Sequence, residues 1–153
     1  MPWSHGHFHW NELMTRDVAR AKKFYADTLG WRYDSMPMPD GGTYTLAMVD
    51  GEPVAGIFDI NGPEYKDVDE AWMPYIAVDD VDARVKKATK AGATVMKAAF
   101  DVPDVGRIVV LLEPGERLNT TTRGIGVRPV ALNLRQVGFA NGARDEGGQN
   151  ATA

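Results

Sequence analysis

The stretch Asp17-Val18-Ala19-Arg20-Ala21-Lys22-Lys23 has a second version 63 residues later, Asp80-Val81-Asp82-Ala83-Arg84-Val85-Lys86-Lys87. Each version follows a short apolar segment with the pattern of a strand, and each leads to a glycine, Gly30 or Gly92. A repeat of this length indicates two copies of one supersecondary unit. Such a pair of units creates a space between them, and we expect function there.

The first copy predicts one helix and four strands. Asp17 is a favourable N-cap for a helix that runs to about Leu29, where Gly30 supplies the C-terminal stop. Apolar residues fall on one stripe of that helix: Val18, Ala21, Phe24, Tyr25 and Leu29. The strands are expected at residues 8–15, 31–36, 43–49 and 53–60, with a hairpin turn at Asp50-Gly51.

The second copy repeats this order up to its last strand. Strands are expected at residues 72–79, 94–100 and 106–112, and Asp80 caps a helix that runs to Ala91. The apolar run Ile108–Leu112 predicts a strand buried on both faces. The segment 116–122 has few residues that would fill a core, and a better alternating pattern comes later, at Val130, Leu132 and Leu134.

The predicted fold class is therefore α+β, with two β-α-β-β-β modules whose curved sheets surround a shared cavity and whose helices lie outside. We expect one domain over residues 1–116, with module one at 5–60 and module two at 71–116. Residues 117–153 have five Arg, no Lys and only two acids, and we expect them to form an atypical, partly disordered tail. This change in composition suggests a shifted reading frame or a fused end, which resequencing of the coding DNA would decide.

The composition of the 153 residues excludes several classes of protein. There is no run of the ~18 apolar residues that a membrane span needs and no signal-like start, so we expect a cytoplasmic protein. The chain has no cysteine, which excludes disulfides. A net charge of −4 gives no reason to expect nucleic acid or a membrane as a partner, and leaves a homodimer open.

Several segments resemble one known family: Glu12–Asp17, Lys23–Tyr25 with Leu29–Trp31, Ala77–Asp82 and Arg107–Gly115. They are similar to the vicinal oxygen chelate superfamily, which includes glyoxalase I, bleomycin-resistance proteins and extradiol dioxygenases. The resemblance covers about residues 8–116. It implies the fold but not the reaction, because this superfamily includes lyases, isomerases, dioxygenases and metal-free binding proteins.

The resemblance also implies where metal ligands would lie, on the first and last strands of each module. The first-strand ligand is expected seven residues before the capping aspartate, where this chain has Trp10 and Met73. An indole offers no lone pair to a divalent ion, and a thioether suits only soft metals. The segment Val54–Phe58 has no ligand either. We therefore predict no metal and no other cofactor, although an unconventionally bound divalent metal stays an alternative.

The candidate catalytic residues are Glu12 and Tyr75. Strand alternation places Glu12 on the cavity side, where burial would raise its pKa and suit it to act as a general base or acid. The repeat makes Tyr75 its equivalent in the second module. The alternative is a structural role, in which Glu12 pairs with a basic residue such as Arg107 or reaches water. The same alternation places Phe8, Trp10 and Met14 on the cavity side, and Met73 occupies the metal-ligand position on the first strand of module two. These four are the candidate ligand-binding residues.

Two other groups of residues have weaker interpretations. The alternating histidines His5, His7 and His9 match a spacing that can bind Zn²⁺ or Ni²⁺, but we expect them to be solvated or outside the cavity. An aromatic set is expected to be mostly core, with Trp10 and Tyr75 as the exceptions: Trp10, Trp31, Tyr33, Tyr44, Trp72 and Tyr75.

Together these residues favour a metal-independent protein that binds a small organic molecule. The first alternative is a glyoxalase-like lyase or isomerase that uses Glu12 as its general base. The second is a scaffold or dimer partner without a catalytic role.

Overall fold

The computed structural model describes residues 4–38, 41–103, 105–114 and 130–134, the last of these as backbone only. The predictions for residues 116–122, and for the tail apart from residues 130–134, lie outside the described residues.

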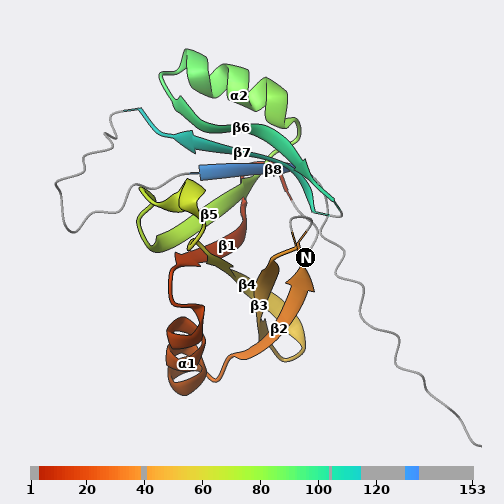
Figure 1. The fold of residues 1–153 in the computed structure, drawn as a ribbon. Helices are drawn as coiled ribbons and strands as arrows, with labels where there is room; N and C mark the ends of the chain where they lie inside the picture. Colours follow the sequence, from red (N-terminus) through yellow and green to blue (C-terminus); the bar gives the residue numbers. More distant parts are fainter. Residues whose placement is uncertain (1–3, 39–40, 104, 115–129, 135–153) are drawn as a thin grey trace, which may run out of the picture.

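The repeated β-α-β-β-β order is present (Figure 1). The first unit consists of β1 (Phe8–Thr15), α1 (Val18–Leu29), β2 (Arg32–Pro37), β3 (Thr43–Val49) and β4 (Glu52–Asp59). A short 3₁₀ helix, η1 (Pro63–Tyr65), lies in the connection between the units. The second unit consists of β5 (Ala71–Ala77), α2 (Val81–Lys90), β6 (Thr94–Val102), β7 (Gly106–Leu112) and β8 (Val130–Leu134).

The local signals in the sequence mark the element ends as predicted. The side chains of Asp17 and Asp80 accept hydrogen bonds from backbone N–H groups three residues on, which caps both helices. Gly30 ends α1 in the left-handed conformation, with φ at 71°. Asp50 and Gly51 have φ angles of 51° and 83°, and two such residues in a row form the turn that joins tightly paired strands.

The strands form one mixed sheet in the order β2-β3-β4-β1-β5-β8-β7-β6. The two units meet where β1 pairs antiparallel with β5, and in each unit the first strand pairs parallel with the last. The molecule is therefore an α+β protein with a curved sheet, as predicted. The strand β8 begins at Val130, so the alternating pattern predicted there is a strand, and it lies beyond the boundary expected at residue 116. The extent of the tail stays a prediction.

Both helices lie on one face of the sheet, which we call the outer face; the opposite face is the inner face. The helix α2 lies along β6 and β7 (Figure 1), and Val81, Val85 and Ala88 pack with Val109 and Leu111 as predicted. The helix α1 lies at the other end of the molecule and has no buried residue. Its apolar stripe is largely uncovered, since the side chains of Phe24 and Leu29 are 57% and 59% exposed. No helix among the described residues is long and apolar enough to cross a membrane.

Candidate functional site

The inner face has a buried acid at its centre. Glu12 lies on β1 opposite Gly56 of β4 and opposite Met73 of β5, so it is at the junction of the two units. Its side chain is buried, which is rare for a carboxylate unless hydrogen bonds replace those of water. The surroundings of this carboxyl group therefore define the candidate site.

Two phenols hold the carboxyl group of Glu12, one on each oxygen. The Tyr75 hydroxyl donates to Oε1 at 2.8 Å, and the Tyr44 hydroxyl donates to Oε2 at 2.7 Å. The indole Nε1–H of Trp10 in turn donates to the Tyr44 oxygen at 2.9 Å. The four side chains come from β1, β3 and β5, so one network ties both units to the same acid.

Burial decides the electrostatics of this network. It raises the pKa of Glu12 above the ordinary value of 4.5, and the hydrogen bonds from the two phenols oppose that change only in part. Burial and the neighbouring Glu12 also raise the pKa of Tyr44 and that of Tyr75. Both phenols therefore keep their protons and remain donors, while Glu12 releases its proton at a higher pH than an exposed glutamate does.

Gly56 makes the contact between Tyr44 and Glu12 possible. The strand β4 separates β3 from β1, so the Tyr44 side chain must pass over β4 to reach the carboxyl group. A methyl group at position 56 would overlap the phenol of Tyr44. Glycine inside a strand often marks such a close approach. Sequence reasoning placed Tyr44 in the core and missed this role, and Gly56 is the signal that could have found it.

Most of the predicted site residues lie together. Glu12 and Tyr75 are hydrogen-bonded as the repeat suggested, and Trp10, Met14 and Met73 belong to one apolar cluster around Tyr75 and Ile108. In this cluster Met73 and Tyr75 are buried, whereas Trp10 and Met14 are partly exposed. The site is thus an acid and two phenols with an apolar border.

Phe8 is not part of this face. The pairing of β1 with β5 is irregular between Phe8 and Trp10, and Phe8 lies opposite Ile76, which packs with the α2 cluster. One extra residue, His9, interrupts the alternation on which the prediction depended. The Phe8 side chain is 70% exposed.

Glu12 is not paired with Arg107, the basic residue named as an example in the structural alternative. Arg107 binds Asp82 and Asp101 at 3.0 Å and 2.9 Å, on the side of α2. The hydrogen bonds to the Glu12 carboxyl group come from two phenols.

The residues present do not fit the metal site that the family resemblance implies. Trp10 and Met73 lie beside Glu12 at the two first-strand positions, Gly56 leaves β4 without a side chain opposite it, and both oxygens of Glu12 are engaged by phenols. The described part of the chain contains no group of three or more His, Asp or Glu that could hold an ion. His5 instead lies 3.2 Å from Asp79 at the surface, apart from this site.

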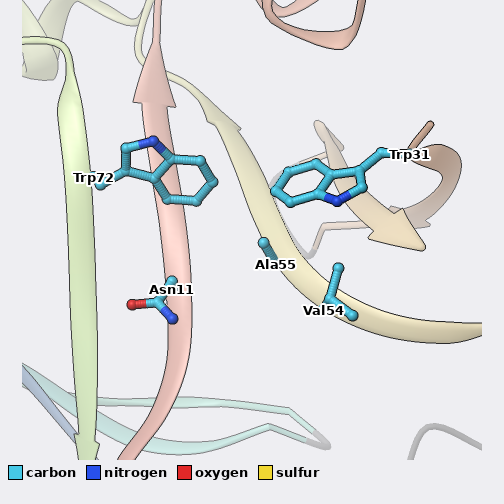
Figure 2. Close-up of a pocket in the computed structure, with 5 residues that line it drawn as sticks. All are labelled: Asn11, Trp31, Val54, Ala55 and Trp72. Atoms are coloured by element: carbon cyan, nitrogen blue, oxygen red, sulfur yellow. The ribbon is translucent and has the colours of Figure 1, made fainter. Parts of the chain in front are cut away.

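A second group of aromatic side chains lies on the outer face. Tyr25 stacks on Trp31 at 4.9 Å between ring centres and accepts a hydrogen bond from the Trp72 indole at 3.0 Å. An open groove of about 300 Å³ borders the rings of Trp31 and Trp72 (Figure 2). Its lining residues are Asn11, Trp31, Val54, Ala55 and Trp72. The predicted aromatic set therefore divides between the two faces, and only Trp10, Tyr44 and Tyr75 contact the acid or its network.

Residues 6–119 match the sequence model of the Glyoxalase/Bleomycin resistance protein/Dioxygenase superfamily. The chain is 43% identical over 106 residues to "Putative glyoxylase CFP32" of Mycobacterium tuberculosis. This alignment covers 69% of this chain and 41% of that protein. It is 31% identical over 116 residues to the anthracycline biosynthesis protein DnrV of Streptomyces peucetius, covering 69% and 42%. The chain thus spans about two fifths of the length of these relatives. The chain is also 30% identical over 129 residues to a glyoxylase-like domain-containing protein of Didymella fabae, and this alignment covers 82% of this chain and 96% of that protein.

Solved structures share the fold at low sequence identity. The protein BH1468 of Bacillus halodurans superimposes with a TM-score of 0.57 at 9% identity, covering 87% of this chain and 98% of that one. A methylmalonyl-CoA epimerase of Streptomyces coelicolor, in complex with 2-nitronate-propionyl-CoA, gives a TM-score of 0.53 at 14% identity, covering 86% and 100%. At these identities the likeness concerns the fold alone.

Proposed function

Because the chain belongs to the Glyoxalase/Bleomycin resistance protein/Dioxygenase superfamily, we propose that it is a metal-independent protein that binds a small organic molecule on its inner face. The site is the network of Glu12, Tyr44, Tyr75 and Trp10 with its apolar border.

The observation that carries this proposal is a fixed polar group set among apolar side chains. Small-molecule sites commonly combine an apolar lining with a few polar groups that orient the ligand. Here Glu12 and its two phenols are fixed by hydrogen bonds, and the partly exposed Trp10 and Met14 border them. The positions that would hold a metal in relatives supply apolar surface instead. The name of the Streptomyces peucetius relative, which refers to anthracycline biosynthesis, supports an organic molecule as the ligand.

A thermal-shift screen of small organic molecules, run in the presence of a chelator, tests the proposal. A ligand that binds only the folded protein stabilises it by about 2.7 kcal/mol at a hundred times its Kd, so the melting temperature should rise by several degrees. The Trp10→Ala variant should lose most of that rise. Trp72→Ala is the matched control, because Trp72 is an indole on the outer face of the adjacent strand.

Two results would contradict the proposal. The first is stoichiometric Ni²⁺, Zn²⁺ or Fe²⁺ in tag-free protein together with binding that the chelator abolishes. The second is a screen in which no compound stabilises the protein, which would favour the scaffold alternative.

The raised pKa of Glu12 favours a second candidate function, a lyase or isomerase of the glyoxalase type. Glu12 would accept the proton from a carbon next to a carbonyl group, and the C–H electron pair would form an enolate. The Tyr75 hydroxyl keeps its single proton, which it donates to Oε1 of Glu12 at 2.8 Å before a substrate binds. In the reaction this hydrogen bond would turn from the acid to the developing oxyanion. A ligand from the screen that carries such a C–H group should then exchange it for deuterium in D₂O. Unchanged exchange in Glu12→Gln would remove Glu12 from the mechanism.

A further inference from the structure

The strand β6 carries a cation at a place where its pairing with β7 is irregular. Val95 lies opposite Leu111, Lys97 opposite Val110, and Phe100 opposite Ile108. From Val95 to Lys97 the chain advances two residues while β7 advances one, and from Lys97 to Phe100 it advances three while β7 advances two. Each step therefore inserts one extra residue in β6, which is the definition of a β-bulge.

These extra residues decide which face Lys97 shares. Directly opposed residues in an antiparallel pair point to the same face of the sheet. Val110 and Ile108 belong to the inner-face cluster with Tyr75, so Lys97 and Phe100 also belong to the inner face. In a regular strand, residues three apart would point to opposite faces, and Lys97 would lie on the α2 side when Phe100 is inside.

The position of the ammonium group agrees with the register. The Lys97 Nζ lies 4.2 Å from the centre of the Phe100 ring, and Phe100 packs against the cluster of Met73, Tyr75 and Ile108. The charge of Lys97 is also close enough to act on Glu12, whose pKa it lowers in opposition to burial. Lys97 therefore lies within the electrostatic reach of the acid at the centre of the inner face.

Lys97 has no carboxylate partner in the part of the chain that the structure describes. The ion pairs formed there by Lys23, Arg84 and Arg107 each join a basic residue to a nearby aspartate, and none includes Lys97. Its side chain is exposed, so an approaching ligand can reach it. A lysine ammonium is a compact charge with three rotatable donors, which suits a carboxylate or phosphate oxygen.

We propose that Lys97 is the anion-binding residue of the inner-face site, and that the ligand is a small organic anion with a flat apolar body. The body would lie against Trp10, Met14 and Phe100, and the anionic group would pair with the Lys97 ammonium. This inference rests on the proposed function and adds the chemical class of the ligand. An anion beside Glu12 is tolerated because burial already favours the neutral form of that acid.

The test compares three probes of one shape by NMR titration of the full chain. Benzoate and phenyl phosphate carry the anion, and benzamide is the neutral match for benzoate. In the wild-type protein we expect both anions to bind about fivefold or more tightly than benzamide, the scale of one partly exposed ion pair. Raising the salt concentration should weaken the binding of both anions and leave the binding of benzamide unchanged.

Variants assign the effect to one residue. In Lys97→Gln the preference for the anions should fall below about twofold while benzamide binds as before, and Lys97→Arg should keep the preference. Lys90→Gln is the matched control, because Lys90 is an exposed lysine in the last turn of α2 and its loss changes the net charge equally.

The outcomes separate this inference from the proposed function. Equal binding of benzoate and benzamide in the wild-type protein, or an anion preference that persists in Lys97→Gln, would overturn the role of Lys97 and leave the small-molecule site standing. Absence of shifts at inner-face residues with all three probes at millimolar concentration would count against both. A preference for phenyl phosphate over benzoate would identify a phosphate ligand, and the reverse a carboxylate.

Discussion

At the scale of the residue, a buried carboxyl group such as that of Glu12 needs protein hydrogen bonds in place of water. Tyr44 and Tyr75 supply one bond to each oxygen, and both phenols keep their protons because their own pKa values are raised. Burial still dominates, and the folded protein holds the proton of Glu12 more tightly than the unfolded chain does.

This difference makes stability depend on pH in a defined direction. Between the ordinary pKa of 4.5 and the raised pKa, the folded state binds more protons than the unfolded state, so the free energy of unfolding decreases as pH rises. Glu12→Gln removes this contribution. Urea unfolding from pH 4 to pH 8 should show the variant gaining stability relative to the wild type as pH increases. Parallel pH profiles of the two proteins would refute the assignment.

Gly56 and Tyr44 form a second testable pair. Gly56→Ala should displace the Tyr44 phenol from Glu12 and cost about 1–3 kcal/mol of unfolding free energy, through overlap and a lost buried hydrogen bond. In a Tyr44→Ala background the same change should cost much less, because the phenol is gone. A double-mutant cycle measured by urea unfolding gives this coupling, and additive effects would disprove it.

At the scale of the element, the two helices are equivalent in sequence but not in burial. Asp17 and Asp80 cap them in the same way, yet α2 covers the apolar face of β7 while α1 buries none of its residues. Amphipathic helices gain most of their stability from tertiary packing. The two copies of the helix therefore contribute unequally to the core.

Two valines at equivalent positions of the repeat allow the contributions of the two helices to stability to be compared. Val81 is fully buried at the start of α2, and its repeat partner Val18 is partly exposed at the start of α1. We expect Val81→Ala to lower the free energy of unfolding by about 2 kcal/mol and Val18→Ala by less than half of that. Chemical denaturation of both variants provides the measurement. Equal losses would mean that α1 packs as tightly as α2.

Local signals explain what could be predicted about the elements and the site. Caps, the Asp50-Gly51 turn and the apolar runs depend on neighbouring residues, and the structure has them where the sequence indicates. The link between Glu12 and Tyr75 followed from the repeat. The sequence does not show on which face of the sheet Phe8 and Lys97 lie. Each position depends on a β-bulge, and a bulge is defined by the register with the neighbouring strand. Tyr44 was missed because its contact crosses a whole strand.

At the scale of the whole molecule, the sheet is continuous from β2 to β6, and β8 lies between β5 and β7. The strand β8 pairs parallel with β5 and antiparallel with β7, so it joins the first and third strands of the second unit. The alternating pattern at Val130, Leu132 and Leu134 indicated this strand. The sequence did not indicate its place between β5 and β7, because 17 residues separate Leu112 from Val130.

Removal of β8 tests its contribution. A chain shortened to residues 1–129 would leave β5 and β7 with unpaired edges, which favours association with other chains. We expect a lower melting temperature and aggregation on size-exclusion chromatography. A shortened chain that stays monomeric and as stable as the full chain would instead support the boundary predicted at residue 116.

The antiparallel joint between β1 and β5 relates the two units by an approximate two-fold axis, so Trp10 faces Tyr75 and Glu12 faces Met73. Positions 12 and 75 are equivalent in the repeat, yet one is an acid and the other a phenol. A site with true two-fold symmetry accepts a ligand equally well when the ligand is turned end for end. Here the two ends of a ligand bound across the axis would meet different chemistry, so the divergence of the copies would impose a single orientation on it.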